Sequence, residues 1–292
     1  MEQDKMNIQW YPGHMTKTRR QMEADLKQVD AVCEIVDARI PVSSRNPDID
    51  ALCGDKPRIV ILNRMDLADP AITKKWVEHY RSKGIAAFPT DCKTRKGLND
   101  FQPAVRSVLK EKLQRNAAKG MSKAMRVMVV GIPNVGKSTL INQISCRKGA
   151  KAENRPGVTR GKQWVTVDNG LLLLDTPGIL WPKFEDPEVG LMLAYTGAVK
   201  EDVIDTEELA CRLIKLLHLH YPQSLKDRYA IEAEAEVSGY ELLEMAGRKR
   251  GFLISGGKIN TERMAKVLLD EFRAGKLGRF TLESPEGTNY GG

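Results

Sequence analysis

The pattern of hydrophobic and polar positions changes character once along the chain. Over residues 1–180, short runs rich in apolar and β-branched side chains alternate with stretches of helical spacing. Near-continuous apolar runs predict strands buried on both faces, and strands that alternate with helices form mostly parallel sheets. The expected strands are residues 31–36, 58–62, 85–88, 126–130, 163–167 and 171–174. We therefore predict an α/β domain over residues 1–185, with a parallel-rich sheet covered by helices on both faces and a helical linker near residues 100–119.

From residue 186 onward, helix-start signals replace strand signals. The capping candidates are Asp186 before Pro187, Asp205 with Glu208 three residues later, and Asn260, whose helix would end at Gly275. No run between residues 187 and 250 has a convincing strand pattern. We expect a smaller all-helical domain over residues 186–282 and a disordered tail over residues 283–292, which is rich in Gly, Pro, Ser and Asn.

The composition indicates what kind of partner the protein binds. The 292 residues carry a net charge of +8, which favours a polyanion because Lys and Arg neutralise phosphates. The cysteines form no C-x-x-C pair, so we expect reduced thiols and no zinc site. The polar N-terminus lacks the apolar stretch of a signal peptide, and no window approaches the ~18 apolar residues of a membrane span. These features predict a cytoplasmic protein with no membrane partner.

A phosphate-binding loop lies in the middle of the chain. Residues 131–138 read G-I-P-N-V-G-K-S and fit the pattern G-x-x-x-x-G-K-[ST]. Glycines let the backbone point its N–H groups at phosphates, Lys137 supplies charge to the β- and γ-phosphates, and Ser138 offers a hydroxyl to Mg²⁺. The residues predicted to bind phosphate here are Asn134, Val135, Gly136, Lys137, Ser138 and Thr139.

Two further segments downstream have the chemistry of nucleotide switches. Asp175 follows an apolar run and can hold Mg²⁺, while the Gly178 N–H can bond a γ-phosphate. Thr159 lies between the phosphate loop and this D-x-x-G sequence. A threonine there can complete the magnesium shell when a triphosphate is bound and release it after hydrolysis.

The residues expected to read the base come before the phosphate loop. Asn63 and Asp66 follow a predicted strand, and the Asp66 carboxylate can accept two hydrogen bonds that guanine offers and adenine does not. Arg64 stands where a lysine is usual, and its planar guanidinium can still pack along the sugar and base. Asp91, Cys92 and Lys93 follow the next strand, where the Cys92 backbone N–H can bond guanine O6.

The order of these five pieces is base, base, phosphate, switch, switch, which resembles a P-loop GTPase domain with circularly permuted motifs. Residues 9–15 (Q-W-Y-P-G-H-M), 37–41 (D-A-R-I-P) and 175–183 (D-T-P-G-I-L-W-P-K) narrow the resemblance to the ribosome biogenesis GTPase A family of bacterial large-subunit assembly factors. The resemblance implies a GTP hydrolase that binds GTP or GDP with Mg²⁺ and acts as a molecular switch in late 50S assembly. It further implies the 50S precursor, its rRNA and its ribosomal proteins as partners, with a monomer off the ribosome.

Catalysis needs a group that the D-x-x-G segment does not supply. Ile179 occupies the position where many GTPases place a water-orienting glutamine. His14 is our candidate to orient or deprotonate water, although it can equally cap a turn or contact RNA. Resemblance to GTPases stimulated by monovalent cations suggests that Asn134 binds K⁺; the alternative is a turn residue that tolerates unusual dihedral angles.

The sequence also allows two other functions, and it contains several basic clusters that are candidates for binding RNA. The first alternative is a nucleotide-sensing, RNA-binding assembly module with little turnover. The second is an ATP-dependent small-molecule kinase, against which Asn63 and Asp66 argue. Candidate rRNA contacts are Lys17, Arg19, Arg20, Lys110, Lys112, Arg115, Lys119, Lys123, Arg248, Lys249 and Arg250.

Residues 255–258 (S-G-G-K) superficially resemble a phosphate loop, but we interpret them as an ordinary loop.

Overall fold

The computed structural model describes residues 15–145, 163–168, 170–176, 186–199 and 205–287. The chain divides into two compact units. The larger unit comprises residues 9–183 together with Glu283–Gly287, and the smaller comprises mainly Phe184–Leu282. The smaller unit is therefore joined to the larger one at both of its ends along the chain.

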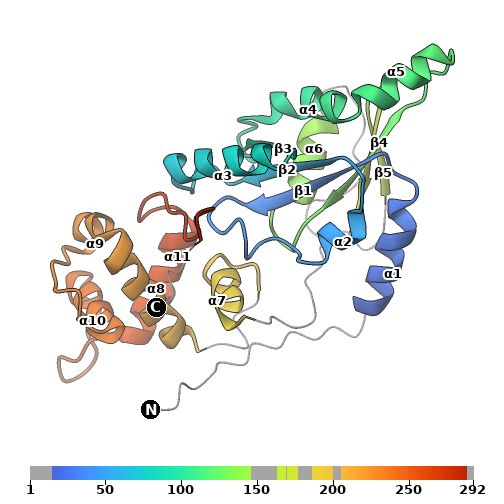
Figure 1. The fold of residues 1–292 in the computed structure, drawn as a ribbon. Coiled ribbons are helices and arrows are strands. Elements are labelled where there is room, and N and C mark those ends of the chain that lie inside the picture. Colours follow the sequence, from blue (N-terminus) through green and yellow to red (C-terminus); the bar gives the residue numbers. More distant parts are fainter. Residues whose placement is uncertain (1–14, 146–162, 169, 177–185, 200–204, 288–292) are drawn as a thin grey trace. The chain divides into compact units, whose positions relative to one another are not determined.

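A six-stranded sheet forms the centre of the larger unit, with the order β3-β2-β1-β4-β6-β5 (Figure 1). All neighbouring pairs are parallel except β5 with β6. The strands are β1 (Ala31–Asp37), β2 (Arg58–Asn63), β3 (Ala86–Pro89), β4 (Met125–Val130), β5 (Gln163–Asp168) and β6 (Leu171–Asp175). Every residue of β1 is buried, as expected for a central strand of a parallel sheet. The predicted α/β fold class is confirmed.

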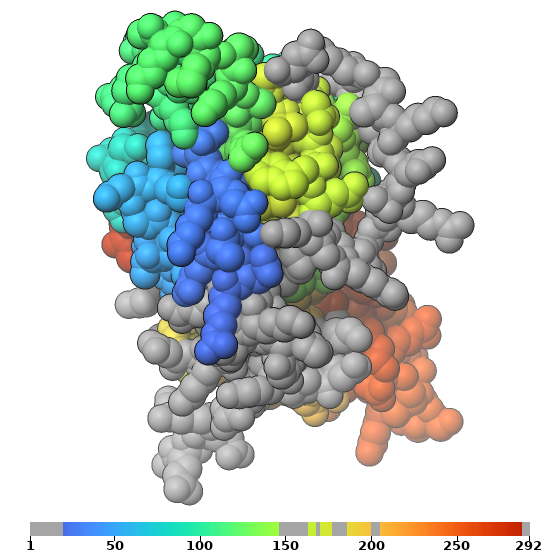
Figure 2. Space-filling view, turned by 90° about the vertical axis from the view of Figure 1, so that its right-hand side faces the viewer, coloured from blue at the N-terminus to red at the C-terminus, as the bar shows by residue number. Residues whose placement is uncertain are grey.

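The helices of the larger unit pack on the sheet through apolar faces. Met22 and Leu26 join Ile49 in one core cluster, while Trp76 and Tyr80 belong to a second. The helices are α1 (Met15–Leu26), α2 (Ile49–Cys53), α3 (Pro70–Ser82), α4 (Phe101–Val108), α5 (Lys110–Ala118) and α6 (Lys137–Ser145), with a 3₁₀ turn at Leu98–Asp100. The antiparallel β5 forms one edge of the sheet, opposite β3, and much of it is open to the surface (Figure 2).

Five helices make up the described part of the smaller unit. They are α7 (Pro187–Tyr195), α8 (Thr206–His220), α9 (Pro222–Tyr229), α10 (Gly239–Lys249) and α11 (Thr261–Arg273). Asp186, Asp205 and Asn260 each accept backbone hydrogen bonds at a helix start, as their sequence positions suggested. The reciprocal capping box forms at Ser238 and Glu241 instead of at Asp205. No helix in the described residues is long and apolar enough to cross a membrane.

Residues 283–287, which the sequence placed in a disordered tail, belong to the larger unit. The Glu283 carboxylate accepts hydrogen bonds from the backbone N–H of Val42 (2.5 Å) and of Ser43 (3.0 Å), and from the Ser43 hydroxyl. Its backbone carbonyl accepts from Trp76 Nε1 at 2.9 Å. Glu283 is buried, and burial raises the pKa of its carboxyl to about 7. The rest of the tail, residues 288–292, lies outside the described residues.

We expect Glu283→Ala to lower the free energy of unfolding by about 2 kcal/mol, because it leaves the buried backbone N–H of Ser43 and the partly buried one of Val42 without their acceptor. Urea denaturation measures this. Glu283→Gln is the matched control, since its carbonyl keeps an acceptor for Val42 and Ser43 and should recover at least half of the loss. Equal stability of Glu283→Ala and the wild type would contradict the assigned anchoring role.

The raised pKa of Glu283 also sets a pH dependence. The native state binds this proton more tightly than the unfolded chain, whose carboxyl titrates near 4.5. The resulting stabilisation is fully present below pH 4.5 and is lost as the pH rises through 7. Glu283→Gln carries no such proton, so its stability relative to the wild type should rise over that interval.

Candidate functional site

The phosphate loop connects β4 to α6 and needs glycine at two positions. Gly131 has a φ of 155°, and a Cβ there would lie 2.6 Å from the Ile35 carbonyl oxygen. Gly136 has a φ of 111°, and a Cβ there would lie 2.3 Å from Asn63 Nδ2. The backbone thus curls tightly at the start of α6, where N–H groups and the helix dipole favour an anion. This cradle fits nucleotide phosphates.

Lys137 is buried beneath this loop. Its Nζ donates to the carbonyl oxygens of Gly131 at 3.0 Å and Ile132 at 2.7 Å. Burial lowers the pKa of Lys137 to about 8, and the nearby Asp175 charge opposes that shift only in part. An arriving phosphate would add negative charge beside the ammonium and favour its protonated form.

Asp175 and Ser138 lie at the carboxyl ends of the neighbouring parallel strands β6 and β4. Asp175 ends β6 and is in register with Val129 on the parallel strand β4, while Ser138 lies in the first turn of α6. The Thr176 hydroxyl donates to the Val129 carbonyl at 2.7 Å and holds the end of β6 against β4. A buried carboxylate and a hydroxyl are oxygen ligands of the kind that Mg²⁺ binds. Three other predicted site residues, His14, Thr159 and Gly178, lie outside the described residues.

Asn63 connects the base-reading segments to the phosphate loop. Its Nδ2 donates to the Val135 carbonyl at 2.7 Å. Its Oδ1 accepts from the Cys92 backbone N–H at 3.0 Å and from the Thr90 hydroxyl at 3.3 Å. Segments on both sides of β4 in the sequence therefore meet at one side chain. The Cys92 N–H, which the sequence suggested as a donor to guanine O6, is in this structure a donor to Asn63.

Arg64 contacts the phosphate loop directly. It has a φ of 62°, and its Nη2 donates to the Asn134 carbonyl at 2.8 Å. Its Nη1 lies 3.6 Å from Asp37 Oδ2. Here the guanidinium bridges the loop to β1, whereas the sequence suggested packing along the sugar and base. Asn134 itself has a φ of 59°, the left-handed conformation that asparagine tolerates.

Asp66 is exposed on the turn after β2. The Met65 backbone N–H donates to the Thr90 carbonyl at 3.0 Å, which fixes the turn beside the loop that begins at Asp91. Asp91 accepts from the Lys93 backbone N–H at 2.9 Å and from the Thr94 hydroxyl. Asp66 and the segment 91–93, which the motifs predict to read the base, are thus held by one hydrogen-bonded pair of loops.

Asp37 and Arg39 form a buried ion pair at the end of β1, for which the motifs predicted no physical role. Arg39 Nε and its backbone N–H both lie 3.0 Å from Asp37 Oδ1, and Nη2 lies 2.8 Å from Oδ2. Burial alone would raise the pKa of Asp37, but the Arg39 charge lowers it below its ordinary value. Asp37 is in register with Asn63 on β2. The sequence held one signal for this ion pair: Asp37 is a carboxylate at the end of a predicted strand, and that strand lies beside β4, which leads into the phosphate loop.

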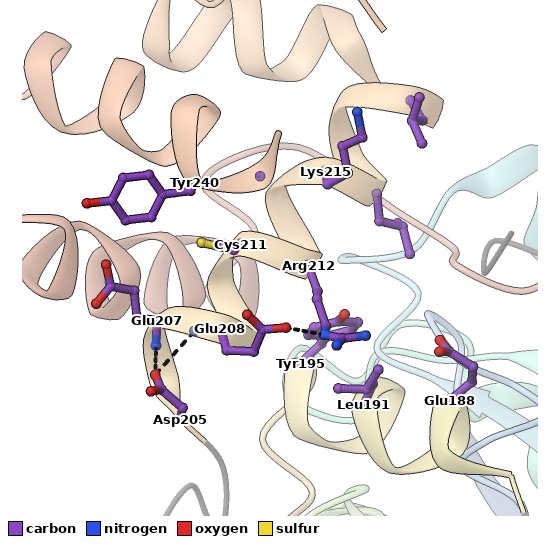
Figure 3. A pocket seen from close by; sticks show the side chains of 13 residues that line it. Glu188, Leu191, Tyr195, Asp205, Glu207, Glu208, Cys211, Arg212, Lys215 and Tyr240 are labelled. Atoms are coloured by element: carbon purple, nitrogen blue, oxygen red, sulfur yellow. Dashed lines mark hydrogen bonds and ion pairs between the residues drawn. The ribbon is translucent and has the colours of Figure 1, made fainter. Parts of the chain in front are cut away.

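A pocket of about 850 Å³ lies elsewhere, within the smaller unit between α7, α8 and α10 (Figure 3). Asp205 accepts the backbone N–H groups of Glu207 and Glu208, and Glu208 accepts from Arg212 Nε at 2.6 Å. Carboxylates on Glu188, Asp205, Glu207 and Glu208 line it. They outnumber the two cations of the lining, Arg212 and Lys215, so the net negative charge disfavours phosphates and this pocket does not compete with the loop at residues 131–138 as a nucleotide site.

Comparisons with known proteins agree with this geometry. Residues 126–240 match the family described as 50S ribosome-binding GTPase. Ribosome biogenesis GTPase A of Priestia megaterium is 48% identical over 282 residues, covering 96% of this chain and 98% of the relative. The GDP-bound structure of TM YlqF is 30% identical, with a TM-score of 0.65, and the match covers 92% of this chain and 100% of that one. GNP-bound YlqF from T. maritima matches with a TM-score of 0.60 at 30% identity, over 93% of this chain and 100% of that one.

The fold and the site define a circularly permuted P-loop GTPase, in which the loops predicted to read the base precede the phosphate loop. The protein hydrolyses GTP, and its class binds GTP or GDP with Mg²⁺. At 48% identity over nearly its whole length, the chain belongs to the ribosome biogenesis GTPase A family. The predicted resemblance and the role as a GTPase in ribosome biogenesis are confirmed, and the kinase alternative is excluded.

Proposed function

We propose that the protein is a GTP-driven switch in late assembly of the 50S ribosomal subunit. Its GTP form binds the 50S precursor through rRNA and ribosomal proteins, and hydrolysis releases it as a cytoplasmic monomer. The observation that carries the proposal is the Asn63 side chain, which joins the base-reading loop to the phosphate loop in one hydrogen-bonded unit. The match of residues 126–240 to 50S ribosome-binding GTPases supports the choice of subunit.

The chain connectivity supports a switch. The helical unit begins at Phe184, shortly after the D-x-x-G residues, and its other end runs into Glu283, which is hydrogen-bonded within the GTPase unit. Ordering of the segment after Asp175 by a γ-phosphate would therefore act on a unit tethered at both ends. The helical unit is, in this proposal, the main rRNA-binding part.

The site residues take the following proposed roles. Lys137 stabilises charge on the β- and γ-phosphates, and Asp66 reads guanine. Mg²⁺, which shields the phosphate charge, would be held by Ser138, Thr159 and Asp175. The phosphates would contact Asn134, Val135, Gly136, Thr139 and Gly178, while Asn63, Arg64, Asp91, Cys92 and Lys93 shape the base site. His14 positions the attacking water in place of a glutamine.

The test is binding to purified 50S precursors with a non-hydrolysable GTP analogue or with GDP. We expect at least tenfold tighter binding with the analogue, together with faster GTP hydrolysis when subunits are added. Equal affinity in the two nucleotide states would contradict the switch. Nucleotide-dependent binding without stimulated hydrolysis would instead favour an assembly module with little turnover.

We further propose that K⁺ bound at Asn134 assists hydrolysis. The exposed Asn134 side chain lies on the phosphate loop, where a cation can stabilise developing charge. We expect hydrolysis to be at least several-fold faster in KCl than in NaCl at equal ionic strength. Asn134→Ala should remove the difference between the two salts; identical wild-type rates in KCl and NaCl would refute the K⁺ role.

A further inference from the structure

The chain between α10 and α11 forms a closed hairpin. The backbone N–H of Ile254 donates to the Lys258 carbonyl at 2.9 Å, and that of Asn260 donates to the Phe252 carbonyl at 2.8 Å. Gly256 and Gly257, at the tip, have φ values of 83° and 74°, and no atom lies within 4 Å of where a Cβ on either residue would be. The hairpin projects as a loop next to α10 (Figure 1). It is a defined element that extends into solvent.

The base of the hairpin is firmly attached to the helices beside it. Glycine is required at residue 247, because a Cβ there would lie 2.5 Å from Ile259 Cγ2. The Arg263 guanidinium lies 4.3 Å from the centre of the Phe252 ring. Arg250, which the sequence suggested as an RNA contact, instead pairs with the buried Glu271. The hairpin therefore presents its tip from a rigid base.

Two adjacent aliphatic side chains close to the tip are exposed. Leu253 is 61% exposed, the highest value among large hydrophobic side chains in the described part of the chain, and Ile254 is 46% exposed. Single exposed hydrophobic residues are ordinary. A neighbouring pair on an anchored hairpin keeps a larger apolar surface in water, which is unfavourable in free energy. A contacting partner would remove that cost.

The surroundings of this apolar tip are positively charged. Residues 248–261 include four cationic residues and no Asp or Glu. With Arg250 paired internally, the cations left are Arg248, Lys249 and Lys258, all exposed. Within the described residues, no carboxylate forms an ion pair with any of these three, and the adjacent Glu262 pairs with Lys266 at 2.7 Å. The charge complement of this surface is a polyanion.

We propose that this hairpin, residues 250–260, inserts into structured RNA beside Arg248 and Lys249, the last two residues of α10. Arg248, Lys249 and Lys258 neutralise phosphates, and Leu253 with Ile254 packs against sugars and bases in the wide, shallow minor groove. Proteins that bind the minor groove of DNA likewise combine Arg and Lys with inserted aliphatic side chains. Two side chains are too small an apolar area to hold a protein partner, for which about 800 Å² per side is usual. The inference deepens the proposed function, on which it rests.

The experiment measures affinity for a 23S rRNA transcript at several KCl concentrations. Lys249→Ala/Lys258→Ala should reduce the slope of log affinity against log salt by about two, because each lost phosphate contact removes about one. Leu253→Ser/Ile254→Ser should weaken binding about tenfold with an unchanged slope, since it removes no charge. Lys266→Ala and Leu219→Ser are matched controls, being exposed residues elsewhere in the same unit that should change neither quantity.

The outcomes separate the hairpin from the wider function. If the wild type binds the transcript and both double variants match it, the hairpin proposal is overturned while the proposed function stands. If the variants bind RNA normally but lose affinity for 50S precursors, the tip contacts a protein and the RNA assignment is wrong. If the wild type binds 50S precursors but not the transcript, the hairpin proposal fails while the proposed function stands; if it binds neither, both fail. Because all four substituted side chains are exposed, thermal unfolding should show unchanged stability in every variant.

Discussion

Lys137→Ala should lower kcat for GTP hydrolysis by about 10²-fold or more. The ammonium is buried and is held by the carbonyl oxygens of Gly131 and Ile132 within the phosphate loop. A preorganised positive group at the position of developing charge contributes about 3–4 kcal/mol to the transition state. Steady-state phosphate release measures the effect. Lys112→Ala, on the surface helix α5, is the control and should keep wild-type activity; a Lys137→Ala rate within about twofold of wild type would refute the assignment.

The depressed pKa of Lys137 makes a second, independent readout. Burial lowers it to about 8, so the nucleotide-free protein loses this positive charge as the pH rises through 8. Phosphate binding favours the charged form, and GTP affinity should therefore fall above pH 8. Lys137→Arg keeps its charge across this range, so its affinity, whatever its absolute value, should not show the same decline.

Asp66→Ala should abolish the preference for guanine. The wild-type carboxylate is exposed on a turn that the Met65–Thr90 backbone bond fixes, so it is free to accept hydrogen bonds from the base. Two hydrogen bonds to a charged acceptor are together worth about 3–6 kcal/mol, which corresponds to at least a hundredfold loss of GTP affinity. ATP affinity should stay unchanged. Displacement of a fluorescent nucleotide measures both constants.

The control for this substitution is Asp55→Ala, which removes another exposed aspartate, after α2, from the same unit. It should leave the ratio of GTP to ATP affinity unaltered. A guanine preference that survives in Asp66→Ala would show that another group reads the base.

The fold was predictable because its strands are locally encoded. Near-continuous apolar runs placed all six strands to within one residue, and capping residues placed the starts of α7, α8 and α11 equally well. The linker at residues 100–119 differs, because it is two helices separated at Leu109. Leu109 is buried, with a φ of −102°, so tertiary packing interrupts a sequence whose local pattern is helical throughout.

The contacts that organise the site were less predictable. The motifs identified Asn63 and Lys137 as site residues. They did not predict the hydrogen bond from Asn63 to Val135, because it joins residues 72 positions apart and depends on the conformation of the Asn63 side chain. The bonds from Ser43 to Glu283 span 240 positions, and no local pattern encodes them. Low hydrophobicity marked the tail as disordered, whereas two backbone N–H groups and a hydroxyl hold its first residue in place.

Whether two separated parts of the chain build one guanine pocket is tested most directly by Asp66→Asn titrated with GTP and with xanthosine triphosphate. Xanthine carries a carbonyl where guanine carries the exocyclic amine, so an amide at residue 66 can donate where the carboxylate accepted. The wild type should prefer GTP, and Asp66→Asn should prefer xanthosine triphosphate. A variant that still prefers GTP would contradict the placement of residue 66 at the base.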